Sequence, residues 1–145
     1  MVTNETPCYH LNINSNRNDH LGVNMSDATD LIWTFSQEVP IPDEVNEILV
    51  DGEEAICSYK TIRDTATITN KRIIIADKQG IMGNKIEIYT IPFKSINMYS
   101  TENSSGMFDV NSELELWTRM GHLKINLKKG IDIRKIDRII AQHIL

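Results

Sequence analysis

Residues 113–128 of the chain read ELELWTRMGHLKINLK and hold the pattern that decides the fold. Leu114 and Leu116 alternate with glutamates before Met120-Gly121-His122, and leucine and isoleucine alternate with lysine and asparagine after it. This period of two on both sides of a turn is typical of a β-hairpin. The sequence therefore predicts two antiparallel strands with one apolar face and one charged, salt-bridged face.

The same period of two continues upstream of this hairpin. Asn70-Lys71 has the chemistry of a tight turn, and Pro92 removes a backbone donor, so it marks an edge, a bulge or a bend. We expect further strands over residues 55–63, 65–69, 72–77, 86–91 and 95–101.

Downstream of the hairpin the period changes to that of a helix. Ile133, Ile136, Ile140 and Ile144 recur at helical spacing, and Asp132 stands where an N-cap is expected. A sheet that exposes apolar side chains at its open end needs a cover, so we expect this isoleucine face to pack against the strands.

The chain before residue 55 divides into two parts. Residues 1–24 are rich in Asn and predict a polar N-terminal arm. Residues 25–54 predict an acidic helical segment, with one short helix from Ser26-Asp27 to Phe35 and a second that begins at Pro42.

These elements place the chain in the α+β, mainly β class. About seven antiparallel strands over residues 55–145 are expected to fold on themselves as a barrel or to split into a sandwich. The C-terminal helix caps this domain, and the short helices precede it.

Composition restricts the function. The 145 residues are 41% hydrophobic and carry a formal net charge of -5, which disfavours a globally basic nucleic-acid binder. Residues 25–54 hold nine acidic residues and no basic ones, whereas residues 55–145 hold fourteen basic and nine acidic residues. We predict that the acidic segment packs against basic surface, in its own chain or in a neighbour.

The sequence predicts no cofactor and no metal site. Cys8 and Cys57 are expected to be free thiols of a cytoplasmic protein, since the chain has neither a signal peptide nor a transmembrane span. Cys8, His10 and His20 lack the spacing of a ligand set. No residues have the arrangement of a nucleophile with its base or of a phosphate-binding loop, so we expect no enzyme.

Two groups of residues are candidates for binding. The basic residues of the turns could form an anion-binding rim, although solvated turn residues are the commoner explanation. They are Lys60, Arg63, Lys71, Arg72, Lys78 and Lys85. Trp117 should point outward beside Glu115 and, with Trp33, is a candidate interface anchor, unless another part of the same chain covers it.

Several ordered motifs resemble the bacterial pleckstrin-homology (PH) domain family, once catalogued as a domain of unknown function. The resemblance covers about residues 40–145. The chain departs from the family pattern at Asn84, Phe93 and Asn111, where the family often has Lys, Tyr and Asp. The motifs are Ile62-Arg63-Asp64, Thr69-Asn70-Lys71-Arg72, Asp77-Lys78-Gln79-Gly80, Gly83, Ile91-Pro92-Phe93, Gly106-Met107-Phe108-Asp109, Glu113-Leu114-Glu115-Leu116-Trp117 and Gly130-Ile131-Asp132.

The resemblance implies a small interaction module without a known catalytic centre that self-associates, in some members as rings. We therefore expect a homo-oligomer that can also bind another protein and does not bind nucleic acid. The alternative is a peripheral binder of anionic lipid headgroups or of the membrane surface, although the first hairpin lacks a phosphoinositide motif. A third option, a small-molecule carrier or enzyme with a ligand inside the barrel, is disfavoured because small barrels fill their interior with side chains.

Overall fold

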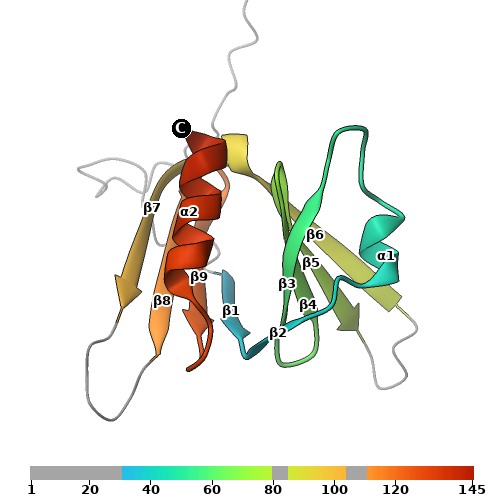
Figure 1. Cartoon of the computed structure of the whole chain (residues 1–145), viewed down its shortest axis with the longest axis horizontal. Helices are drawn as coiled ribbons and strands as arrows, with labels where there is room; N and C mark the ends of the chain where they lie inside the picture. The colour runs from blue at the N-terminus through green and yellow to red at the C-terminus, as the bar shows by residue number, and fades with distance from the viewer. Residues whose placement is uncertain (1–30, 80–84, 104–110) are drawn as a thin grey trace, which may run out of the picture.

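The computed structural model describes residues 31–79, 85–103 and 111–145, which form two β-sheets and a C-terminal helix (Figure 1). The expected arm, residues 1–24, lies outside the described residues. The first sheet has four strands in the order β1-β9-β8-β7. Its strands are β1 (Leu31–Phe35), β7 (Ile96–Asn103), β8 (Ser112–Thr118) and β9 (Gly121–Leu127).

The second sheet has five strands in the order β2-β3-β4-β5-β6, and all of its pairings are antiparallel. Its strands are β2 (Gln37–Val39), β3 (Ala55–Lys60), β4 (Thr65–Thr69), β5 (Arg72–Gln79) and β6 (Lys85–Pro92). Strands β3 to β9 are the seven antiparallel strands expected over residues 55–145. They make a sandwich of two sheets rather than a closed barrel.

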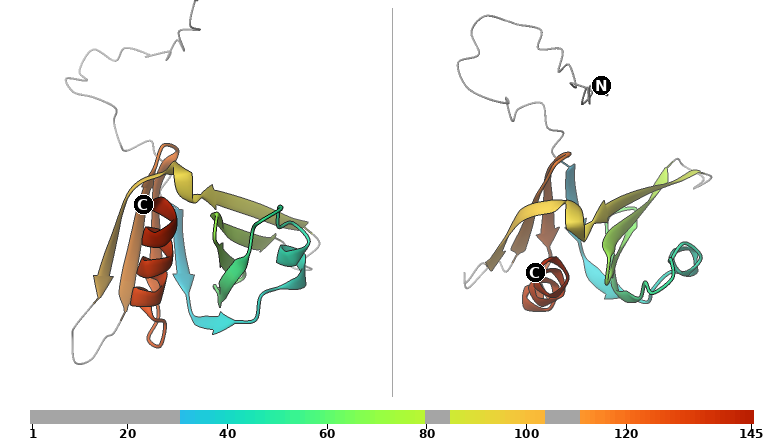
Figure 2. Two further views of the ribbon diagram at one scale, coloured as in Figure 1. Left: turned by 45° about the horizontal axis from the view of Figure 1, so that its top comes forward. Right: turned by 90° about the horizontal axis from the view of Figure 1, so that it is seen from above.

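The chain crosses from one sheet to the other at two corners. Ser36 separates β1 from β2, and its backbone N–H donates to the carbonyl oxygen of Lys60 at 2.8 Å. The 3-10 helix η2 (Phe93–Ser95) separates β6 from β7, immediately after Pro92. The bend expected at Pro92 is therefore this corner, and Figure 2 shows the two sheets diverging from it.

The deciding hairpin forms as predicted. Leu116 lies opposite Leu123, and Leu114 lies opposite Ile125. All four side chains are buried between the sheets. On the opposite face the Nζ atom of Lys124 lies 2.8 Å from a carboxylate oxygen of Glu113, so the outer face carries the expected ion pair.

The C-terminal helix α2 (Ile133–Ile144) is also confirmed. The Asp132 carboxylate accepts hydrogen bonds from the backbone N–H groups of Arg134 and Lys135, which caps the helix. Ile136 and Ile140 are fully buried in the cluster that both sheets share. Because α2 buries this face, the isoleucines belong to the core rather than to an interface.

The first predicted helix is wrong over its described part. Residues 31–35 form strand β1, which pairs in parallel with β9. Phe35 is fully buried, and Leu31 and Trp33 pack against the core cluster. These three apolar residues alternate in the sequence, which is the period of a strand rather than that of a helix. The tertiary pairing with β9 overrides the capping signal of Ser26-Asp27.

The second predicted helix is present but short. Helix α1 (Asp43–Asn46) begins after Pro42, as expected, and buries Val45. After β2, residues 40–54 run beside the outer face of the five-stranded sheet (Figure 1), where Ile74 is fully buried although it lies outside the main core. This segment therefore covers a second, smaller core.

Candidate functional site

The basic residues of the expected anion-binding rim lie at opposite ends of the five-stranded sheet. Lys60 and Lys85 lie at one end, opposite Thr65 and Gln79 respectively, and Arg63 and Lys78 are also at this end. Lys71, in the turn between β4 and β5, and Arg72, the first residue of β5, lie at the other end. A strand of eight residues spans about 23 Å, so the six cations do not converge on one anion.

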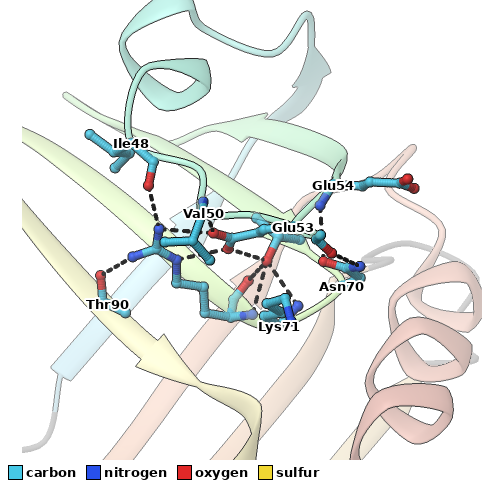
Figure 3. A network of polar contacts seen from close by, with 10 residues as sticks. Ile48, Val50, Glu53, Glu54, Asn70, Lys71 and Thr90 are labelled. Atoms are coloured by element: carbon cyan, nitrogen blue, oxygen red, sulfur yellow. Dashed lines mark hydrogen bonds and ion pairs between the residues drawn. The ribbon is translucent and has the colours of Figure 1, made fainter.

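The side chain of Arg72 donates its hydrogen bonds within the chain. Figure 3 shows the polar network around Glu53, with Ile48 and Thr90 at its margin. The Arg72 Nε donates to Glu53 Oε1 at 2.8 Å, and one terminal nitrogen donates to Glu53 Oε2 at 3.0 Å and to the Ile48 carbonyl at 2.8 Å. The Glu53 side chain is fully buried. Arg72 is therefore the partner of a buried carboxylate rather than part of an open rim.

The Glu53 carboxylate has more than one donor. The Thr69 hydroxyl donates to Oε1 at 2.8 Å, and the Val50 backbone N–H donates to Oε2 at 3.1 Å. The hydrogen bonds from Arg72 are the largest cause that lowers the pKa of Glu53 to about 2, against the opposing effect of burial. This network fixes the end of the acidic segment to the β4–β5 turn.

Two further ion pairs tie the acidic segment to basic residues. Glu44 of α1 lies 3.7 Å from Lys78, and Glu38 of β2 lies 2.6 Å from Lys135 of α2. For the described part of the segment, residues 31–54, the prediction that it packs against basic surface is thus confirmed within the chain. The acidic segment partly neutralises the basic charge of residues 55–145.

The remaining candidates at the Lys60 end surround a compact turn. Lys60, Arg63 and Lys85 are exposed. The Thr61 hydroxyl accepts from the Asp64 backbone N–H at 3.0 Å, and the Thr61 N–H donates to the Asp64 carbonyl at 2.8 Å. Burial is the largest cause that raises the pKa of Asp64. The turn is therefore held by Thr61 and Asp64.

The two tryptophans lie on opposite faces of the four-stranded sheet. Trp33 faces the space between the sheets, where its ring centroid lies 6.2 Å from that of Tyr89. Trp117 lies on the outer face, as expected, and its ring stacks on His122 with centroids 4.9 Å apart. His122 in turn contacts Glu115 at 2.6 Å. The two tryptophans therefore do not form one interface.

An open groove of about 380 Å³ lies beside Trp33. Its walls come from β1, from the end of β6 that leads into η2, and from the β8–β9 turn. Leu31, Tyr89, Ile91 and Leu123 supply apolar surface. The sequence pattern did not identify this groove, because its walls come from segments far apart in the chain, from Leu31 to Leu123.

The free edges of the sheets also carry apolar side chains. β6 pairs only with β5 in the described structure, and Ile86 and Ile88 on its outer face are 50% and 42% exposed. β7 pairs only with β8 there, and Met98 is 56% exposed. The alternation of Ile86 and Ile88 was readable in the sequence, but only the sheet order places them at an edge.

Within the described residues, no His, Cys, Asp or Glu side chains are grouped in threes or more to hold a metal ion. Cys8, His10 and His20 lie outside those residues. None of the helices in the described ranges has the length and apolar character needed to cross a membrane.

Comparison with known proteins agrees with the fold. The family model "Bacterial PH domain" matches residues 28–144, so the match begins ahead of β1. The uncharacterized protein YjqA of Bacillus subtilis is 38% identical over 104 residues, which are 70% of this chain and 82% of that protein.

Two solved structures of PH domains are similar. One is a DUF1696 family protein with a pleckstrin-homology domain from Shewanella loihica, with a TM-score of 0.66 and 34% identity over 74% of this chain and 96% of that chain. The other, a pleckstrin homology domain from Shewanella amazonensis, has a TM-score of 0.55 and 39% identity over 70% and 83% of the two chains. The chain therefore belongs to the bacterial PH domain family.

Proposed function

We propose that this protein is a non-enzymatic interaction module that self-associates through the free edges of its two sheets. The observation that carries the proposal is the pair Ile86 and Ile88, about half exposed on edge strand β6. Exposed apolar edge strands are templates for pairing with another chain. Pro92 stands only at the last position of β6, so it leaves the remainder of the edge able to pair.

A second, different edge supports a head-to-tail arrangement. β6 belongs to the five-stranded sheet and β7 to the four-stranded sheet, and they leave η2 in different directions (Figure 2). If β6 of one copy contacts β7 of the next, the contact is heterologous and closes into a ring when the rotation per subunit allows it. The same edges could also accept a strand from another protein.

The Glu53 carboxylate, whose pKa is strongly lowered, supports the non-enzymatic part of the proposal because it binds groups of its own chain. Glu53 has a pKa near 2, but its oxygens accept from Arg72, Thr69 and Val50. A carboxylate that is buried and saturated with internal donors stabilises the fold and is not presented to a substrate.

The decisive experiment measures the solution mass of the full chain by light scattering at several concentrations. We expect an oligomer, and we expect the double variant Ile86→Lys, Ile88→Lys to weaken association at least tenfold, because apolar burial at the edge is lost. Ile62→Lys is the matched control, since Ile62 is 83% exposed in the β3–β4 loop rather than at an edge.

Two results would reject the proposal. A monomeric mass at every concentration would show that the edges do not associate. A control variant that dissociates as readily as the edge variant would show that exposure alone, rather than the edge strand, controls the mass.

The alternative function is binding to anionic lipid headgroups. It is favoured by Lys60, Arg63 and Lys85, which are exposed at one end of the five-stranded sheet. If this alternative holds, the chain sediments with phosphatidylserine vesicles, and the amount bound falls as the salt concentration rises. The triple variant Lys60→Glu, Arg63→Glu, Lys85→Glu should then no longer sediment with them.

A further inference from the structure

The groove beside Trp33 is an incompletely filled part of the core. Leu31, Trp33 and Tyr89 line it and pack against the main cluster, yet all three remain only partly buried. An open apolar groove of this kind gains free energy when another apolar segment covers it. A segment that covers this groove has to reach β1, β6 and the β8–β9 turn, which form its walls.

The chain itself enters the described structure at this groove. Leu31 is the first described residue and forms part of the wall. β1 pairs only with β9 in the described structure, so its other edge is open to a further strand. Thirty residues precede Leu31, and a segment only a few residues away is confined near the groove at small entropic cost.

The sequence immediately before Leu31 has the pattern of such a strand. Residues 21–25 read LGVNM, in which Leu21, Val23 and Met25 alternate with glycine and asparagine. Residues 26–30 read SDATD, a polar connection of the length found in hairpin loops. The sequence of residues 21–30 is therefore compatible with a strand followed by a hairpin loop.

A loop of this length would place the apolar residues of 21–25 opposite the apolar residues of β1 that line the groove. Across a five-residue loop, an antiparallel strand places residue 25 opposite Leu31 and residue 23 opposite Trp33. Opposite residues of a pair point to the same face of a sheet. Met25 and Val23 would thus face the space between the sheets, as Leu31 and Trp33 do.

We propose that residues 21–25 of the same chain dock along the free edge of β1 and cover this groove. The inference is independent of the proposed self-association, which uses β6 and β7. A segment from a second copy and an external apolar peptide are the competing occupants.

The test measures amide hydrogen exchange of the full chain by mass spectrometry. Val23→Asp, Met25→Asp should raise the exchange rate of the β1 amides about tenfold, because two charged side chains cannot enter an apolar groove. The matched control is Leu11→Asp, Ile13→Asp, which changes an equally spaced apolar pair in the same N-terminal region. The control should exchange as the unaltered chain does, and circular dichroism should report the same fold for all three.

The outcomes are distinguishable. Equal exchange in all three chains would overturn the proposal. If the aspartates unfold the chain, Val23→Ser, Met25→Ser repeats the test with a milder change, and equal exchange there would overturn it too. In the unaltered chain, the β1 amides could also exchange more slowly as the protein concentration rises. That result would assign the groove to a second copy and would overturn the proposal.

Discussion

At the scale of single residues, the most constrained contact is the one between Glu53 and Arg72. The carboxylate is fully buried, and both of its oxygens accept hydrogen bonds from the guanidinium. Removing one member of such a pair leaves the other charge buried without its partner, which costs more than the pair contributes by itself. Neither residue could be paired from the sequence, because nineteen positions separate them.

We predict that Glu53→Gln lowers the free energy of unfolding by about 2 kcal/mol at neutral pH, since Arg72 loses its charged partner. Because folding lowers the pKa of Glu53 from 4.5 to about 2, its stabilisation is fully present above pH 4.5 and is lost as the pH falls through 2. Urea unfolding at several pH values measures this.

The control for this prediction is Glu54→Gln, which removes an exposed neighbouring carboxylate. We expect Glu54→Gln to change stability by less than about 0.5 kcal/mol. An equal loss for both variants, or a Glu53→Gln effect that persists at pH 2, would contradict the importance of the ion pair.

At the scale of elements, helix α2 shows how a local signal and a tertiary contact combine. Asp132 supplies the cap, and the buried face of Ile136 and Ile140 attaches the helix to both sheets. β1 shows the opposite case, in which the local signal was misleading. Its Leu31, Trp33 and Phe35 alternate as in a strand, whereas Ser26-Asp27 ahead of them is a capping signal that favours a helix.

We predict that Asp132→Ala lowers the free energy of unfolding by about 1 kcal/mol, because the N–H groups of Arg134 and Lys135 lose their acceptor. Asp132→Asn retains an acceptor oxygen at the cap and should cost much less. Thermal unfolding followed by circular dichroism measures both variants. Equal midpoints for Asp132→Ala and the unaltered chain would show that the cap does not stabilise α2.

A second element-scale prediction concerns the cover over the five-stranded sheet. Val45 of α1 is 1% exposed. We expect Val45→Asp to destabilise the chain by at least about 2 kcal/mol, because it buries a charge in the small outer core. Val45→Ile is the conservative control. Unchanged urea stability of Val45→Asp would mean that α1 does not cover the sheet.

At the scale of the whole molecule, the distribution of charge matters more than its sum. The acidic segment neutralises Arg72, Lys78 and Lys135 within the chain. Fewer basic residues therefore remain for an external anion than the net positive charge of residues 55–145 suggests. The proposed self-association therefore relies on the exposed apolar side chains of edge strands β6 and β7 rather than on charge.

We predict that the full chain does not sediment with phosphatidylserine vesicles at an ionic strength of about 0.15 M, where exposed charges are screened beyond about 8 Å. Self-association should persist there, because apolar contacts at β6 do not depend on charge. Vesicle binding at this ionic strength, together with loss of the oligomer, would favour the lipid-binding alternative.

Local periodicity and local hydrogen bonds were enough to predict strands β3 to β9, the β8–β9 hairpin and the capped isoleucine helix. Long-range contacts were needed to establish that residues 31–35 form a strand, that Arg72 is paired with Glu53, and that Ile86 and Ile88 lie at an edge. Each of these outcomes depends on contacts between segments far apart in the chain. The free energy that selects them comes from burial and pairing between those segments, which no single window of sequence contains.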